Sequence, residues 1–253
     1  MCRQGLFVSV FALAALAAQA NFEDYVNGME IDERTAVVIV DPQNDFLSPE
    51  GVAWGVVGNS VTENDTVNNI EKLMMAAKKS GIPLFISPHW YFPNDHHWMF
   101  EGALEKLMHD IRMFDRAGQL DVTGFEGSGS DWVEQLKPYI EHEDTVVVNP
   151  HKIYGPQNND LTLQLRKRRI DKIILGGMSA NLCIESHLRD MVEQGFEVVV
   201  VKDATAAAQP VLETGEILDG YKAAVINFKM IASDVWTTAQ AVDKITIHTM
   251  SVA

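Results

Sequence analysis

Thr35-Ala-Val-Val-Ile-Val-Asp41 is an apolar run that ends in an acid, and the turn residues Pro42-Gln-Asn-Asp45 follow it directly. Such a run is typical of a strand buried on both faces of a parallel sheet. Further strands are predicted at residues 84–86, 145–149, 172–175, 197–203 and 229–232. Helices are predicted at residues 64–79, 103–114, 161–168, 180–194, 212–226 and 237–242. This alternation predicts an α/β fold in which helices cover both faces of a mostly parallel sheet.

The length and composition of the chain limit its class. With 253 residues it suits one α/β domain, and 47% hydrophobic with 22% charged residues is ordinary for a globular protein. The formal net charge of −15 leaves no surplus of Lys and Arg to neutralise phosphates, so we expect no nucleic acid partner. Residues 90–130 interrupt the alternation with an aromatic cluster and a glycine-rich segment. This excursion is predicted to be a lid or insertion.

The first twenty residues have the pattern of a secretory signal peptide. Arg3 precedes an apolar run from Leu6 to Ala17, and Ala18-Gln-Ala20 matches an A-x-A cleavage site. The run is too short for a comfortable membrane span. We therefore expect residues 1–20 to be removed and residues 21–253 to form an exported domain, periplasmic or secreted, with no stable membrane anchor. An uncleaved anchor or a misassigned start codon is the alternative.

The chain has two cysteines, and only one of them belongs to the predicted mature protein. Cys2 lies in the signal segment, which leaves Cys183 without a partner for an internal disulfide. A free cysteine is often a small buried apolar residue. Alternatively it is a reactive thiol, and its position in the predicted fold favours that interpretation.

Three chemically active residues follow predicted strands. Asp41 closes the first strand, Lys152 lies just past the third, and Cys183 opens the helix after the fourth. Ligands of open parallel sheets bind beyond the carboxyl ends of the strands, so these residues are expected at one edge. A helix N-terminus and a nearby ammonium would lower the pKa of the thiol, and a carboxylate could accept its proton. A turn residue at 41 and a surface lysine at 152 are the plainer alternatives.

Three motifs in order resemble the isochorismatase-like cysteine hydrolases, a family related to nicotinamidases and carbamoylsarcosine amidases. They are Val37-Val-Ile-Val-Asp41-Pro-Gln-Asn-Asp45-Phe46, Pro150-His-Lys152-Ile-Tyr154 and Gly176-Gly-Met-Ser-Ala-Asn-Leu-Cys183-Ile-Glu-Ser. The resemblance covers about residues 34–245. It implies a three-layer α/β/α sandwich with a Rossmann-like sheet and a triad of Cys183, Asp41 and Lys152. It also implies a cis peptide at Met178–Ser179 and an oxyanion hole formed by the backbone N–H groups of Ser179 and Cys183.

The retained cysteine favours one branch of this family. Members that hydrolyse isochorismate, a vinyl ether, typically lack it, so Cys183 indicates an acyl-enzyme route on a small amide, ureide or carbamoyl substrate. Nicotinamidases bind a divalent metal after the second strand, where His89 and His96 could be ligands. Ser87, however, stands at the position of their aspartate, and serine is a poor ligand. We therefore expect no metal and no other cofactor.

Further expectations concern the substrate pocket and the partners. The candidate pocket residues are Phe46, His89, Trp90, His96, Tyr154 and Asn181. The partner is predicted to be a small-molecule substrate, and similar proteins commonly form homo-oligomers. Two other functions stay open: an isochorismatase-type ether hydrolase, and an exported binding protein without turnover.

Overall fold

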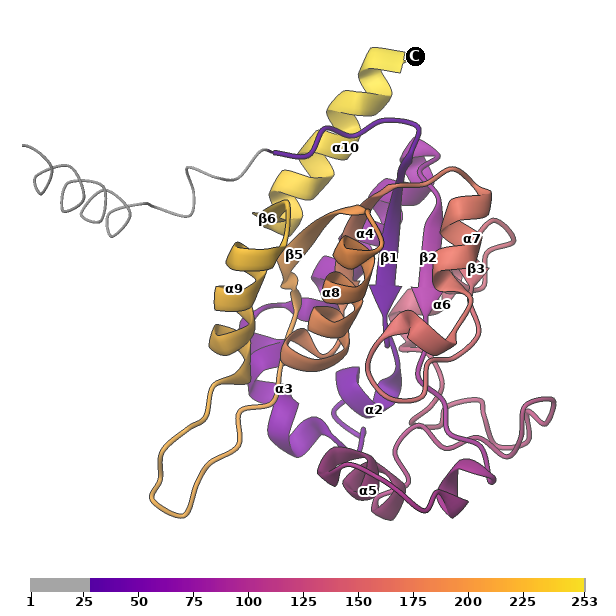
Figure 1. Ribbon diagram of the computed structural model, residues 1–253, viewed down its shortest axis with the longest axis vertical. Helices are drawn as coiled ribbons and strands as arrows, with labels where there is room; N and C mark the ends of the chain where they lie inside the picture. Colours follow the sequence, from indigo (N-terminus) through magenta and orange to yellow (C-terminus); the bar gives the residue numbers. More distant parts are fainter. Residues whose placement is uncertain (1–27, 253) are drawn as a thin grey trace, which may run out of the picture.

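The computed structural model describes residues 28–252, which form one sheet with helices on both sides (Figure 1). The six strands are β1 (Thr35–Val40), β2 (Leu84–Ser87), β3 (Val146–Val147), β4 (Lys172–Gly177), β5 (Glu197–Thr205) and β6 (Asp234–Trp236). They lie in the order β3-β2-β1-β4-β5-β6, and every neighbouring pair is parallel. This confirms the predicted α/β sandwich with a Rossmann-like sheet.

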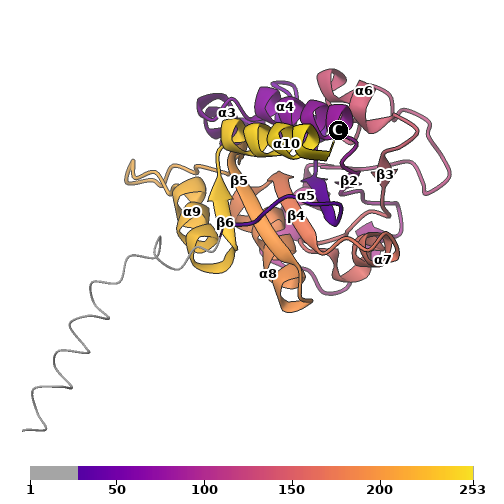
Figure 2. The ribbon, with the colours of Figure 1, turned by 90° about the horizontal axis from the view of Figure 1, so that it is seen from above.

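Helices form a layer on each face of the sheet (Figure 2). One layer contains α3 (Trp54–Glu63), α4 (Thr66–Ser80) and α10 (Thr238–Val252), and the other contains α7 (Leu161–Lys167), α8 (Glu185–Glu193) and α9 (Gly220–Ile231). Along β1, Val37 and Ile39 pack into the core under the first layer, whereas Ala36, Val38 and Val40 pack under the second. Both faces of β1 are therefore dry, which explains its uninterrupted apolar sequence.

The strand order creates a switch point between β1 and β4. The chain proceeds from β1 outward through β2 to β3, then crosses back to β4 and continues to β6 on the other side. In open α/β sheets the crevice at such a point is the usual ligand site. Here Asp41 directly follows β1, and Cys183 lies in a short π-helix, η5 (Ala180–Ile184), that follows β4.

Some predicted elements differ from the structure. Residues 229–232 were predicted as a strand but belong to the end of α9 and its C-cap, and the strand begins at Asp234. The helix predicted from residue 212 begins only at Gly220, where the Asp219 side chain accepts a hydrogen bond from the backbone N–H of Lys222. Helix α3 was not predicted, because two glycines and three valines in its ten residues have poor helix propensity.

The excursion at residues 90–130 has little regular structure. It contains a 3₁₀ turn, η2 (Asp95–His97), and one short helix, α5 (Ala103–Asp110). Its last part leads to η3 (Glu134–Leu136) and α6 (Lys137–Ile140), and η4 (Pro156–Asn158) follows β3. In the described residues, no helix is long and apolar enough to cross a bilayer. The predicted signal peptide lies outside the described residues.

The carboxylate of Asp45, in the short helix α2 (Asn44–Leu47), fastens the excursion to the sheet edge. It accepts hydrogen bonds from the backbone N–H of Phe114 at 2.6 Å and of Val52 at 3.4 Å. Burial raises the pKa of Asp45, and these N–H donors oppose that effect. A Cβ at Gly129 would lie 1.9 Å from Oδ1 of Asp45, so only glycine permits this contact.

Candidate active site

Four buried side chains meet at the carboxyl edge of the sheet: Asp41, His89, His151 and Cys183. One potential ligand atom from each lies within 4.8 Å of those of the other three. Asp41 follows β1, His89 follows β2, His151 follows β3 and Cys183 follows β4. Four neighbouring parallel strands thus each deliver one reactive group to the same point.

The backbone at Asp41 is held in an uncommon conformation. Its φ of 47° lies in the left-handed region, and its N–H donates to the carbonyl of Ser87 at 3.0 Å. Beside it, Gly177 has a φ of 115°, and a Cβ there would lie 2.0 Å from the carbonyl oxygen of Val40. The close approach of β1 and β4 therefore requires glycine, and it brings Asp41 and Cys183 together.

His151, and not Lys152, contacts the Asp41 carboxylate. Nε2 of His151 lies 2.8 Å from Oδ1 of Asp41, and both side chains are fully buried. The backbone N–H of His151 donates to the carbonyl of Pro88 at 3.0 Å, and His151 forms an isolated parallel bridge with His89. This extended pairing aims the imidazole at the switch point.

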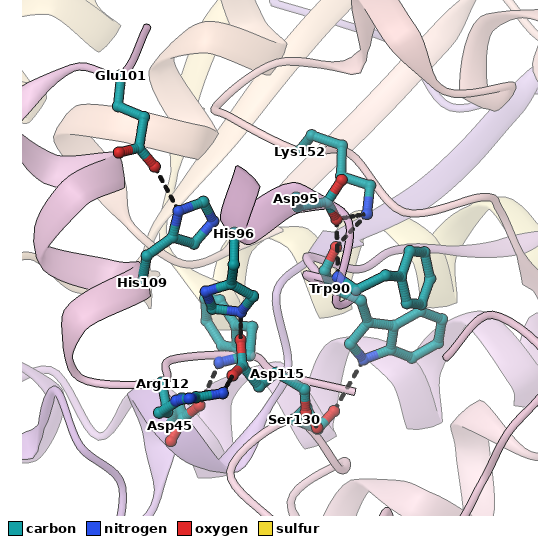
Figure 3. A network of polar contacts seen from close by, with 12 residues as sticks. Asp45, Trp90, Asp95, His96, Glu101, His109, Arg112, Asp115, Ser130 and Lys152 are labelled. Carbon is teal, nitrogen blue, oxygen red and sulfur yellow. Dashed lines mark hydrogen bonds and ion pairs between the residues drawn. The ribbon is translucent and has the colours of Figure 1, made fainter. Parts of the chain in front are cut away.

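The predicted position of Lys152 at the thiol and the carboxylate requires correction. Its ammonium donates to the carbonyl of Trp90 at 2.8 Å, forms an ion pair with Asp95 and lies 3.8 Å from the centre of the Phe92 ring (Figure 3). Within residues 28–252 it makes no hydrogen bond to Asp41 or Cys183. Consecutive side chains of an extended segment point to opposite sides, so only one of residues 151 and 152 can face Asp41.

The environment of Cys183 differs from the sequence-based expectation of a low thiol pKa. Burial raises the pKa of the thiol well above its ordinary value, and the nearby Asp41 carboxylate adds to this effect. Hydrogen bonding by the backbone N–H groups of Ser179 and Cys183 acts in the opposite direction. Desolvation outweighs the short helical terminus, so the resting group is the thiol. The Met178–Ser179 peptide is cis, as the resemblance implied.

The buried His187, which was not predicted as a site residue, hydrogen-bonds to the backbone of Cys183. Nδ1 of His187 lies 2.7 Å from the carbonyl oxygen of Cys183, and its Nε2 lies 2.9 Å from Oγ of Ser87. Asn159 donates to the same Ser87 hydroxyl at 3.1 Å. Burial lowers the pKa of His187 to about 3, which keeps the ring neutral. The i, i+4 spacing of Cys183 and His187 was the available signal.

His89 is fixed on two sides. Gln43 donates to its carbonyl at 2.8 Å and accepts from its N–H at 2.9 Å, so the side-chain amide imitates a neighbouring strand. Nε2 of the His89 ring lies 3.0 Å from the carbonyl of Lys152. Burial lowers the pKa of His89 well below its ordinary value, and His151 adds to this.

The other predicted pocket residues surround this core at different depths. Phe46 is buried with its ring edge-on to Phe114, and Trp90 donates from its indole N–H to the carbonyl of Ser130 at 3.0 Å. Asn181 lies two residues before Cys183, and its side-chain oxygen accepts a weak hydrogen bond from the Ser179 hydroxyl at 3.4 Å. Tyr154 is half-buried, and burial raises its pKa, with a further contribution from Cys183.

His96 belongs to a peripheral polar network and not to the buried site. It pairs with Asp115 at 2.7 Å, while the neighbouring His109 pairs with Glu101 (Figure 3). His96 lines a surface pocket of about 560 Å³, and Lys152 lines another of about 600 Å³. His89 and His96, the two residues considered as possible metal ligands, are therefore not brought together. In the described residues, the one group suited to a metal is Asp41, His89, His151 and Cys183.

Comparison with known proteins agrees with this fold. Residues 35–239 match the model of the isochorismatase domain. The ureidoacrylate amidohydrolase RutB of Pseudomonas savastanoi pv. phaseolicola is 32% identical over 185 residues, covering 70% of this chain and 72% of that protein. RutB of Azorhizobium caulinodans is 30% identical over 189 residues, covering 70% and 78%.

Solved structures give the same result. A cysteine hydrolase from Pseudomonas syringae pv. phaseolicola superposes with a TM-score of 0.70 at 26% identity, covering 87% of this chain and 97% of that one. A putative isochorismatase hydrolase from Oleispira antarctica shares the fold with a TM-score of 0.61 at 19% identity, covering 85% and 100%. Fold and site together define an α/β hydrolase with a buried cysteine. The chain belongs to the isochorismatase family, which confirms the predicted resemblance to its cysteine hydrolases.

Proposed function

We propose that this chain is a cysteine amidohydrolase that cleaves a carbon–nitrogen bond of a small ureide, carbamoyl compound or amide. The observation that carries the proposal is the convergence of Cys183 with Asp41 at the switch point of the sheet. The relatives named ureidoacrylate amidohydrolases favour a ureide as substrate. A vinyl-ether substrate is less well supported, because family members that hydrolyse isochorismate typically lack the cysteine that this chain has at position 183.

In the proposed first step, Sγ of Cys183 attacks the substrate carbonyl carbon while its proton passes to Asp41. Because burial raises the pKa of the thiol, a base in contact with it is needed, and the carboxylate lies within 4.8 Å. The negative oxygen of the tetrahedral intermediate is stabilised by the backbone N–H groups of Ser179 and Cys183. Both N–H groups already hydrogen-bond to the Cys183 sulfur, and this observation favours the pair.

In the second half, the C–N bond breaks and Asp41 returns the proton to the leaving amine. Water then attacks the carbonyl carbon bound to sulfur, a thioester from an amide or a thiocarbamate from a ureide, with Asp41 again as base. This releases the carboxylic or carbamic acid and the free thiol. Throughout, His151 orients the Asp41 carboxylate through Oδ1, the role that the family resemblance implied for Lys152. Lys152, bound to Asp95, is proposed to line the entrance instead of the reaction centre.

The test is ammonia or amine release from a panel of ureides, carbamoyl compounds and amides, including ureidoacrylate. Cys183→Ala is expected to fold and to lose activity by about 10⁴-fold or more, as loss of a nucleophile does. Cys2→Ser is the matched control, because it removes the other cysteine, and it should keep full activity. An active Cys183→Ala protein would rule out covalent catalysis.

We also propose that the protein is exported, with cleavage after Ala20, on the pattern of residues 1–20. The intact mass of the protein recovered from its native compartment should correspond to residues 21–253, and a full-length mass would contradict export by cleavage. A homo-oligomer stays a prediction from the family resemblance, and light scattering on the purified protein measures it directly.

A further inference from the structure

The buried cluster offers more ligand chemistry than the proposed hydrolysis uses. One carboxylate, two imidazoles and one thiol are gathered with their donor atoms within 4.8 Å of one another, and all four residues are buried. Zinc binds Cys sulfur, His nitrogen and carboxylate oxygen in four-coordinate sites. Catalysis needs the thiol and the carboxylate, yet His89 has no part in that reaction.

The hydrogen bonding of the cluster is also incomplete. Oδ2 of Asp41, Nδ1 of His89 and Nδ1 of His151 are buried and have no hydrogen-bond partner. Buried polar atoms without a partner are rare, and an ion is one of the few explanations. Three such atoms on three side chains of one cluster point to a ligand that accepts both oxygen and nitrogen donors.

The second histidine cluster of the molecule is a weaker candidate. His96 and His109 lie close together, with ring centres 4.4 Å apart, but each already faces its own carboxylate, Asp115 and Glu101. That cluster also contains no thiol. It therefore serves as the rival site in the experiment.

We propose that Asp41, His89, His151 and Cys183 bind one Zn²⁺ ion that blocks the nucleophile. On binding, a Zn–S bond forms and the thiol proton is released to solvent, with no change of oxidation state. The metal holds the electron pair that would attack the carbonyl, so the enzyme is reversibly inhibited. The inhibition rests on the proposed cysteine chemistry, whereas the binding site does not.

The binding test uses the full chain in a Cys2→Ser background, so that Cys183 is the only thiol. Zinc is titrated in competition with a chromophoric chelator, and Co²⁺ is then added to the metal-free protein. We expect one ion per chain and a thiolate-to-cobalt charge-transfer band in the near ultraviolet. Cys183→Ser should remove the band, and His151→Gln should weaken zinc binding at least tenfold.

Two control variants identify the site. His142→Gln removes an exposed histidine near Asp144 and should leave zinc affinity unchanged. His96→Gln/His109→Gln removes the rival cluster and should also leave it unchanged. The inference is overturned if this double variant abolishes stoichiometric binding, or if no thiolate band appears with cobalt.

A further measurement needs no substitution in the proposed site, so a misfolded variant cannot affect its result. In the same Cys2→Ser background, zinc should slow alkylation of Cys183 by iodoacetamide at least tenfold, and a chelator should restore the rate. Unchanged alkylation would contradict the site.

Activity measurements separate the zinc-site proposal from the amidohydrolase proposal. A cobalt–thiolate band in a protein that hydrolyses none of the panel supports the zinc site and refutes the amidohydrolase. Zinc-dependent turnover lost on chelation would overturn the inhibitory role.

Discussion

The buried cluster of Asp41, His89, His151 and Cys183 and the excursion at residues 90–130 both contain pairs of basic and acidic side chains, but in different surroundings. The His151–Asp41 pair is fully buried, whereas the side chains of the Lys152–Asp95 pair are 23% and 14% exposed. A hydrogen bond is stronger where water is excluded, whereas partly exposed ion pairs contribute little. Residues 151 and 152 are neighbours in the chain, yet one belongs to each region. Sequence adjacency is therefore a poor guide to membership of a site.

The largest effect is expected from a methyl group added between β1 and β4. Gly177→Ala places a Cβ against the Val40 carbonyl at 2.0 Å with a φ of 115°, so we predict a loss of more than about 4 kcal/mol in the free energy of unfolding. Gly124→Ala is the matched control in the excursion. It also has a positive φ but nothing within 4 Å, and should cost about 1 kcal/mol. Equal losses of unfolding free energy for the two variants in chemical denaturation would contradict this prediction.

The next effect concerns catalysis. His151→Ala removes the hydrogen bond that orients Asp41, and we predict a fall in kcat of about 10²- to 10⁴-fold, the usual range for loss of acid–base assistance. Steady-state kinetics on a substrate from the panel measures it, with circular dichroism to verify the fold. Full activity in this variant would show that a residue other than His151 assists Asp41 and Cys183.

A pH effect on stability should come from the buried rings. Folded His187 has a pKa of about 3, against 6.5 for an ordinary imidazole, so between these values the unfolded chain binds the extra proton. Stability is therefore complete above pH 6.5 and falls as the pH drops toward 3. Between pH 6.5 and 5 we expect a loss of about 2 kcal/mol from this ring.

Urea unfolding at both pH values, in the presence of chelator, measures this loss. His187→Asn should reduce the pH dependence, while His142→Gln, at an exposed position, should keep it. If His187→Asn loses stability on acidification as steeply as the unaltered protein, His187 is not the responsible group.

The smallest effect is expected at the residue that the sequence favoured. Lys152→Ala removes a partly exposed ion pair with Asp95, worth about 1 kcal/mol or less. Because its ammonium makes no hydrogen bond to Asp41 or Cys183 among the described residues, kcat should change by less than about tenfold. A fall in kcat as large as that of His151→Ala would indicate that Lys152 takes part in the reaction after all.

One argument, from apolar strands and the residues that follow them, predicted both the fold and the meeting of Asp41 with Cys183. The apolar run at residues 35–40 fits a strand covered on both faces, and Asp41 and Cys183 follow strands that meet at one edge. The sequence-based prediction was wrong where a shift of one residue along an extended segment changes which side chain faces the site. In the segment Pro150-His-Lys152, the pattern cannot say which side chain faces inward, because an extended chain alternates at every residue.

The chain's local patterns predicted the layers of the sandwich, the order of the motifs and the residue that we propose as nucleophile. Periodicity and strand ends are local properties, and the chain records them directly. Three features follow only from the folded arrangement: His151 contacts Asp41, His187 hydrogen-bonds to the Cys183 carbonyl, and the pKa of the thiol rises. These outcomes depend on which side chains are brought together and how much water they lose, and neither is written in neighbouring residues.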